Sequence, residues 1–329
     1  MAEFSSGNFE TLHKYWNDIY FKSTSRLLFS SPDWSELWWQ HFGSDSELHL
    51  GAVIDDGRCI GIAPLRLKDH TAYFIGSDNV CDFLDFIIEP GNEQVFFQTV
   101  LTHLTDKGID TLDLSPLLPE SSVRLFCTDN AQRKDLSISC LQEDVTVVLD
   151  LPGGLAAYHA ILSGKQRHEL LRKERRLNEE GEVIYRISKQ ASAKDMDIFL
   201  QFFRESREDK NKFLTGQMEA FFKAVIDKAA ANQMLMLGML ELNKTPVAVT
   251  LGFDYQNDTY LYNSGYNPAY KWLSVGLLSK YYYIKHSIES GKQRFDFLKG
   301  SEKYKFYLGG KEIPLFRCII KQSLDIKGT

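Results

Sequence analysis

The sequence predicts a mixed α and β protein (α+β class) built from two domains. The chain has 329 residues, more than one hydrophobic core usually encloses, so two domains of roughly 150 residues are expected. Apolar residues at helical spacing alternate along the chain with apolar residues at the two-residue spacing of strands. Hydrophobic residues make up 43% and charged residues 25% of the chain, as in globular proteins.

The first half alternates helices and strands. Residues 31–33 (SPD) are a helix start signal, and aromatic residues follow on one face through residues 34–42. The run LHLGAVIDDGRCIGIAPLRL alternates around the turn at residues 55–57 and predicts a hairpin. The half is completed by a strand at residues 73–76, a helix at 93–107 and a strand from 111.

A proline and two glycines after the strand VTVVLDL mark the predicted domain boundary. We therefore divide the chain into modules of residues 1–151 and 152–329. The segment MLMLGMLELNKTPVAVTLGFDYQNDTYLYNSGY supplies three extended runs separated by turn residues, which predicts an antiparallel meander. The second half also contains predicted helices at residues 163–180, 193–207, 215–231 and from 274, and the strands EVIYRIS, RFDFL and IPLFRCII.

Composition and charge exclude several classes of protein. No run approaches the about 18 uncharged apolar residues that a membrane-spanning helix needs. The start of the chain, MAEFSSGNFETLHKYW, lacks the basic residues and apolar run of an export signal, so we expect a cytoplasmic protein. A net charge of -6 gives no general reason to bind nucleic acid.

Cysteine and histidine usage predicts neither disulfides nor a metal site. The cysteines are odd in number and never spaced as CxxC, which predicts reduced, mostly buried thiols at Cys59, Cys81, Cys127, Cys140 and Cys318. The histidines form no HExxH motif and no pair with a carboxylate at ligand spacing. No bound metal is therefore expected.

Several short motifs resemble a known family. In the second half they are YNSGYNPAY (262–270), LSVGLL (273–278), RFDFLKG (294–300) and the pair Tyr304-Lys305. In the first half they are SPDW, GIAPL and DFLDF. Together they resemble GNAT-type acetyltransferases of the cellulose-biosynthesis (CelD-like) branch, which are relatives of the FemAB transferases. The resemblance implies two tandem GNAT-like modules, each a mostly antiparallel mixed sheet flanked by helices, and an N-acyltransferase activity (EC 2.3.1 class).

The resemblance also implies a site for the pyrophosphate of acetyl-CoA or another acyl-CoA, at a strand-to-helix turn usually written Q/R-x-x-G-x-G/A. The matching residues here are Lys271, Leu273, Ser274, Val275 and Gly276. Such a turn binds anions because the first N–H groups of a helix lack partners within the helix and carry partial positive charge. This sequence has lysine in place of Gln or Arg and serine in place of the first glycine. From the residues alone, Ser274 is equally a plain N-cap.

Candidate catalytic residues follow the same motifs. By resemblance, Lys305 corresponds to a lysine at the reacting centre of FemAB-type transferases, where an ammonium stabilises an oxyanion. Tyr304 and Tyr307 are candidates for protonating the departing thiolate. Asp296, which alternates with phenylalanines on a short strand, is a candidate base for an acceptor amine, since that amine must lose a proton. The alternatives are a solvated basic face and, for Asp296, a structural ion pair.

Two further groups are candidates for substrate binding. SGKQRHELLRKERR is basic on more than one helical face and, with Arg172 and Arg176, is suited to an anionic partner, although solvation is its ordinary role. Asp82 and Asp85, on a stretch read as extended, are expected to share a face and line a substrate cleft between the modules. For the two aspartates, the alternative is a structural role in which each pairs with a neighbouring residue.

The sequence therefore predicts an acyltransferase that moves an acyl group from acyl-CoA to an amine or hydroxyl of a small or sugar-like acceptor. The resemblance adds cell-envelope or exopolysaccharide (polysaccharide) biosynthesis as the setting. Two alternatives stay open. One is a FemAB-like transferase that uses aminoacyl-tRNA, with the basic helix holding the tRNA. The other is a non-catalytic binding protein with the same fold.

Overall fold

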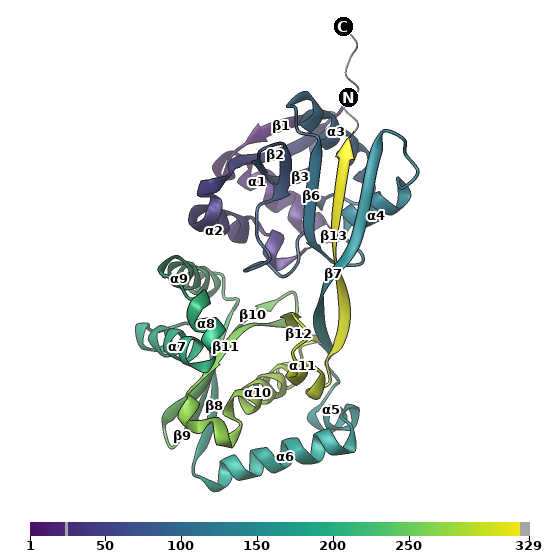
Figure 1. Cartoon of the computed structure of the whole chain (residues 1–329). Coiled ribbons are helices and arrows are strands. Elements are labelled where there is room, and N and C mark those ends of the chain that lie inside the picture. Colours follow the sequence, from purple (N-terminus) through teal and green to yellow (C-terminus); the bar gives the residue numbers. More distant parts are fainter. Residues whose placement is uncertain (24–25, 323–329) are drawn as a thin grey trace. The chain divides into compact units, whose positions relative to one another are not determined.

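The structure, a computed structural model, describes residues 1–23 and 26–322 (Figure 1). It divides into two compact units, the first made of Met1–Asp144 and Ile313–Thr329 and the second of Val145–Glu312. A single boundary after residue 151 does not describe this division, because the chain returns to the first unit at Ile313. Strands β7 (Leu136–Asp150) and β13 (Lys311–Gln322) each pass from one unit into the other.

The first unit contains a mixed sheet in the order β1-β2-β3-β4-β6-β13, with the short β5 paired to β3. Neighbouring strands are antiparallel except β4 and β6, which are parallel. The strands before β13 are β1 (Glu3–Gly7), β2 (Glu47–Asp55), β3 (Arg58–Lys68), β4 (Thr71–Phe74), β5 (Ile87–Ile88) and β6 (Thr111–Leu117). The helices are α1 (Phe9–Lys22), α2 (Pro32–Phe42), α3 (Glu93–Asp106) and α4 (Ser122–Asp129), with single turns η1 (Leu28–Ser30) and η2 (Gly43–Asp45).

Local signals explain the elements of this unit that the sequence predicted. Helix α2 begins as expected, because the Ser31 side chain accepts from the backbone of Trp34 and Pro32 occupies the first helical position. The β2–β3 hairpin is also confirmed: Asp56 and Gly57 both have positive φ at its turn (46° and 74°). Strand β1 and helices α1 and α4 were not predicted.

The second unit contains a sheet in the order β7-β12-β11-β10-β9-β8. The predicted antiparallel meander is confirmed as β9 (Leu235–Leu242), β10 (Thr245–Tyr255) and β11 (Asp258–Tyr266), with β8 (Val183–Ser188) antiparallel to β9. Strand β12 (Arg294–Lys299) lies parallel to β11 and antiparallel to β7. The helices are α5 (Leu155–Ile161), α6 (Gly164–Glu179), α7 (Ala193–Ser206), α8 (Glu208–Phe213), α9 (Gly216–Ala231), α10 (Val275–Glu289) and α11 (Lys303–Tyr307), with the turn η3 (Pro268–Leu273).

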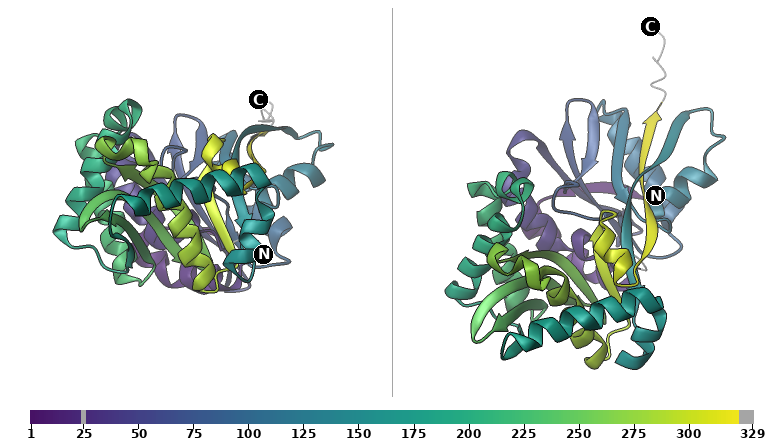
Figure 2. Two further views of the ribbon diagram at one scale, coloured as in Figure 1. Left: turned by 90° about the horizontal axis from the view of Figure 1, so that it is seen from below. Right: turned by 60° about the horizontal axis from the view of Figure 1, so that its bottom comes forward.

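Helices α7 and α10 cover opposite faces of the meander (Figure 1). A Cβ atom added at Gly265 would lie 2.4 Å from the backbone of Phe202 and Phe203 in α7. The next residue of β11, Tyr266, places its ring against Gly276 of α10, as the alternation of a strand requires. Helix α6 lies beside α10 in both views of Figure 2. The core of the unit is therefore a sheet between two helical layers.

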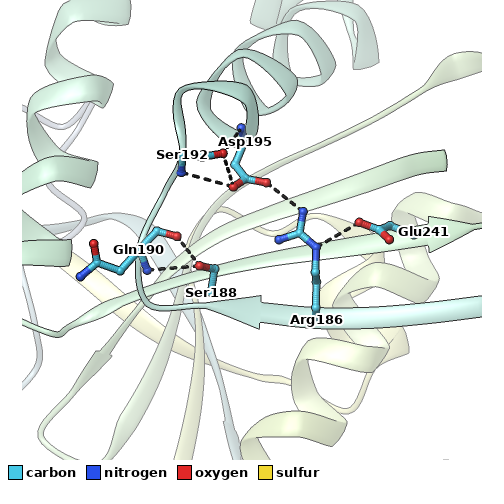
Figure 3. Close-up of polar contacts among 6 residues, drawn as sticks. All are labelled: Arg186, Ser188, Gln190, Ser192, Asp195 and Glu241. Carbon is cyan, nitrogen blue, oxygen red and sulfur yellow. Dashed lines mark hydrogen bonds and ion pairs between the residues drawn. The ribbon is translucent and has the colours of Figure 1, made fainter. Parts of the chain in front are cut away.

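Arg186 on β8 holds the start of α7 to the sheet (Figure 3). Its guanidinium donates to Asp195 of α7 at 2.8 Å and to Glu241 of β9 at 3.0 Å. Burial raises the pKa of Asp195, but hydrogen bonds from Arg186 and Ser192 outweigh it and leave that pKa below its usual value. The stability that Asp195 contributes is therefore present at neutral pH and lost as the pH falls through its lowered pKa.

We expect Arg186→Met to lower the free energy of unfolding by about 1 kcal/mol, since the side chain is 40% exposed and solvent screens the pairs. The loss is expected to shrink in acid, where Asp195 becomes protonated. Urea unfolding at neutral and acidic pH measures both effects. Lys194→Met, on the exposed first turn of α7, is the control, and an equal loss in the two variants contradicts the assignment.

The structure corrects the prediction that all cysteines are reduced. Cys140 on β7 and Cys318 on β13 form a disulfide, whereas Cys59, Cys81 and Cys127 are free and buried. The two bonded residues are 178 positions apart, and sequence spacing does not reveal that their strands are neighbours.

Among the described residues, no helix has both the length and the apolar composition that a membrane-spanning segment needs.

Candidate active site

The parallel strands β11 and β12 of the second unit pair over only three positions. Asp258, Thr259 and Tyr260 lie opposite Arg294, Phe295 and Asp296. Beyond Tyr260, β11 continues to pair with β10, while β12 follows β7 to Lys299. The two strands therefore separate toward their carboxyl ends, where binding sites form in sheets of this kind. β11 leads into α10 and β12 leads into α11.

The turn before α10 brings together the predicted cofactor-binding residues. Leu273 and Val275 are fully buried and fix the turn, while Lys271 has an exposed side chain. Between them, Ser274 is left-handed, with φ of 60°. Its side chain makes no cap hydrogen bond, so its interpretation as a plain N-cap is wrong.

Helix α6 contributes a cation to this turn. The Nζ of Lys173 donates to Oγ of Ser274 at 3.2 Å. Arg176 donates to the carbonyl of Trp272 and lies 5.9 Å from the centre of its ring. Lys173 also pairs with Glu169 at 3.2 Å, and Arg172 is engaged by both carboxylate oxygens of Glu169 at 2.7 and 2.8 Å. Of the two arginines predicted to bind substrate, Arg176 reaches the turn and Arg172 pairs within its own helix.

Lys305 is almost completely buried, with 1% of its surface exposed. Its ammonium donates to the carbonyl oxygens of Leu298 (2.7 Å), Lys299 (2.7 Å) and Gly300 (2.9 Å), and pairs with the carboxylate of Glu302 at 2.9 Å. Leu298 and Gly300 both have positive φ. The ammonium thus holds the chain reversal that joins β12 to α11, and all three of its protons are engaged.

The two predicted tyrosines lie on α11, which follows this reversal. Burial raises the pKa of Tyr304 far above its usual value and also raises the pKa of Tyr307, so both hydroxyls keep their protons at neutral pH. Tyr307 donates its proton to the carbonyl of Gln166 in α6 at 3.2 Å. Both side chains are therefore in the form that a proton donor needs.

The Asp296 side chain on β12 is buried and stabilises the strand through hydrogen bonds. Its Oδ1 accepts from the backbone of Leu298 at 2.8 Å and from the hydroxyl of Thr146 at 3.1 Å. Phe295 and Phe297, its neighbours along the strand, belong to the hydrophobic core. These contacts position the carboxylate where β11 and β12 begin to separate.

Sequence reasoning missed Lys280, which lies one helical turn after Gly276. Its Nζ donates to the carbonyl of Gly276 at 2.8 Å and lies 4.9 Å from the centre of the Tyr304 ring. Burial lowers the pKa of Lys280 to about 7, and the positive charges of Lys210 and Lys305 lower it further while Glu302 opposes them. The signal in the sequence was a lone lysine inside the apolar run LLSKYYYI. At neutral pH this amine can both take up and release a proton.

The prediction for Asp82 and Asp85 is corrected in the first unit. Residues 82–86 form no strand, and positions three apart do not share a face of one in any case. The Asp85 carboxylate accepts from the backbone and hydroxyl of Ser122 at 2.8 and 2.7 Å and from the backbone of Phe86 at 2.9 Å. Burial raises its pKa to about 6. Asp85, at 1% exposure, fills a structural role, and Asp82 is half-buried.

Known proteins resemble this chain in fold. Residues 164–306 match the acetyltransferase (GNAT) domain family. The crystal structure of FemX superimposes with a TM-score of 0.66 at 9% identity, covering 96% of each chain. A tandem GNAT protein from the clavulanic acid biosynthesis pathway gives 0.51 at 10% identity, covering 98% of each chain. The fold is a pair of GNAT-like modules.

This result confirms the predicted fold class and its relation to GNAT and FemAB-type proteins. A further structure with a similar fold is the C-terminal domain of a putative lysylphosphatidylglycerol synthetase from Agrobacterium fabrum, with a TM-score of 0.56 at 11% identity over 95% of this chain and 92% of that one. No curated protein sequence matches the chain. The matched GNAT family region includes the α10 turn, β12 and all of α11 except its last residue, Tyr307.

Proposed function

We propose that the second GNAT-like module is an acyltransferase that moves an acyl group from acyl-CoA to an amine or hydroxyl. The observation that carries the proposal is the separation of β11 from β12 beside the start of α10. The separation lies at the carboxyl ends of the two strands, and the first N–H groups of a helix lack the partners that later ones have. A cytoplasmic enzyme suits this donor.

The donor's diphosphate is placed at the α10 turn. The first N–H groups of the helix carry partial positive charge, and the ammonium of Lys173 already lies against Ser274. Lys271 adds an exposed charge. In this proposal a phosphate oxygen takes over the hydrogen bond that Ser274 now accepts from Lys173.

The proposed reacting groups lie on α10 and α11. The acceptor nitrogen attacks the acyl carbon and passes its proton to Lys280, which is partly neutral at pH 7 because its pKa is about 7. As the carbon–sulfur bond breaks, Tyr304 donates a proton to the thiolate, and the tyrosine is restored from Lys280. Lys305 and Asp296 act as positioning residues, because their contacts hold β12 and α11.

A charge reversal at Lys271 tests the donor site. We expect Lys271→Glu to raise the dissociation constant for acetyl-CoA at least tenfold, since the carboxylate repels the diphosphate and also opposes the helix dipole. Calorimetric titration of wild type and variant measures the change. Lys194→Glu, which places the same charge on the first turn of α7, is the matched control and should leave affinity unchanged.

Two outcomes contradict the donor site. One is the absence of saturable binding of acetyl-CoA to wild type. The other is equal binding by wild type, Lys271→Glu and Gly276→Trp, where the new ring would displace Tyr266 from the turn. Circular dichroism of each variant confirms that a loss of affinity is not a loss of fold.

The second candidate function is transfer from aminoacyl-tRNA. It is supported by the exposed basic residues of α6, which include Lys165, Arg167 and Arg175, and by the similarity in fold to FemX. If the protein binds aminoacylated tRNA but not acetyl-CoA, the result supports transfer from aminoacyl-tRNA. Binding to neither donor favours a non-catalytic protein.

The proposed acceptor is an amine or hydroxyl of a small or sugar-like molecule that is used to build the cell envelope or a polysaccharide. The name of one structural neighbour, a putative lysylphosphatidylglycerol synthetase, supports an envelope setting. Mass spectrometry of a small molecule that copurifies with the protein tests this assignment. If the copurified molecule is CoA or a fragment of it, the result supports transfer from acyl-CoA directly.

A further inference from the structure

Three cysteines from separate elements meet in the first unit. Cys127 on α4, Cys140 on β7 and Cys318 on β13 place their sulfur atoms within 4.8 Å of one another. Cys140 and Cys318 form the disulfide, and Cys127 is free. We call these three residues the cysteine cluster. It lies in a part of the chain for which the proposed transferase reaction gives no role.

The cluster is enclosed by the protein. Cys127 is 3% exposed and Cys318 is not exposed at all, whereas Cys140 is half-buried. Burial raises the pKa of the Cys127 thiol to about 12, although the positive charge of Arg124 opposes the shift. The thiol therefore stays protonated beside the disulfide and is a poor nucleophile. The cluster is not arranged for rapid thiol–disulfide exchange.

We propose that reduction of the Cys140–Cys318 disulfide converts the cysteine cluster into a three-thiolate site for one soft metal ion, with Cu⁺ as the best-fitting ion. A dithiol reductant supplies two electrons and two protons, is itself oxidised to a disulfide, and leaves three thiols side by side. Binding of the ion forms three metal–sulfur bonds and releases the thiol protons to solvent.

The distances suit such a site. With metal–sulfur bonds of about 2.3 Å, three sulfur atoms around one ion lie about 4 Å apart, and the cluster already holds them within 4.8 Å. Small side-chain movements close the remaining difference.

The ligand set selects the kind of metal. Thiolates favour Cu⁺ and Zn²⁺ over hard cations. Within the described ranges, no further histidine, cysteine or carboxylate joins this group, so a tetrahedral Zn²⁺ would lack a fourth protein ligand. Cu⁺ is satisfied by three thiolates. Arg124, whose charge acts on Cys127, offsets part of the negative charge of the complex.

Metal and disulfide exclude each other at this site, because both use Cys140 and Cys318. The disulfide joins β7 to β13, whereas the metal would join α4 to both strands. The first unit therefore has two alternative cross-links, selected by the thiol–disulfide state of the surroundings.

Competition titration tests the proposal. The full chain is reduced with a phosphine, freed of reductant under nitrogen and titrated with Cu⁺ against a chromophoric Cu⁺ chelator. We expect one Cu⁺ per chain, and an affinity at least tenfold lower for Cys127→Ser. Cys59→Ser is the matched control, because Cys59 is also buried and free but lies outside the cluster, and its affinity should equal that of wild type.

X-ray absorption of the wild-type Cu⁺ complex gives a second readout that needs no variant. Three sulfur neighbours at one distance support the site, and a first shell of nitrogen, oxygen or only two sulfurs overturns it. The proposal is also overturned if reduced wild type does not compete with the chelator, or if Cys127→Ser binds Cu⁺ as tightly as wild type. These outcomes are independent of acyl transfer, because none of them measures it.

Discussion

Replacing Lys305 with methionine is expected to lower the free energy of unfolding by about 3 kcal/mol or more. The substitution keeps an unbranched apolar side chain but removes the ammonium that the carbonyls of Leu298, Lys299 and Gly300 now share. A buried acceptor left without a donor costs about 1 to 3 kcal/mol, and here several lose their donor together. Urea unfolding followed by circular dichroism measures the change.

Lys303→Met is the matched control for this result. Lys303 lies two positions earlier on the same helix, α11, and is exposed, so its substitution should change stability by less than about 0.5 kcal/mol. If Lys305→Met unfolds at the same urea concentration as wild type, the ammonium does not hold the reversal. Its role as a positioning residue would then have to be abandoned.

Replacing Gly265 with valine is the second large effect, with an expected loss of about 3 kcal/mol. Valine favours strands, so propensity alone predicts that β11 gains stability. Packing predicts the opposite, because a Cβ atom would lie 2.4 Å from the backbone of α7. Backbone cannot move aside as a flexible side chain does, and inserted methyl groups in a packed core are costly. The midpoint of thermal unfolding measures the outcome.

Gly216→Ala provides the comparison for Gly265→Val. Gly216 is the first residue of α9, and nothing lies within 4 Å of an added Cβ there. Alanine should leave stability unchanged or raise it slightly, because it restricts the unfolded chain. A Gly265→Val protein as stable as wild type would show that α7 does not pack directly on β11.

Elements with a local signal were predictable from the sequence. The α2 start rests on Ser31 and Pro32, and the β2–β3 turn rests on Asp56 and Gly57. Helix α1 was predictable too, although it was not predicted: Leu12, Trp16 and Ile19 follow the helical period, and Asn8 forms a capping box. This signal lies within fewer than four helical turns and does not depend on contacts with other elements.

The contacts within the candidate site were harder to predict from the sequence. The motif around Lys305 identified an important lysine, but its carbonyl partners depend on the positive φ of Leu298 and Gly300. Lys280 is perturbed by burial and by charges on other elements, which no spacing rule contains. The disulfide likewise depends on strand order. Patterns along the chain therefore predicted architecture well and polar partners poorly.

The return of β13 to the first unit has a consequence for how the protein is made. Residues 316–321 of β13 pair with β6, so the first unit lacks one strand of its sheet until the whole of the second unit has been synthesised. Domains generally fold in order from the amino terminus during synthesis. Here the second unit can form first, and the first unit must wait for β13 to emerge.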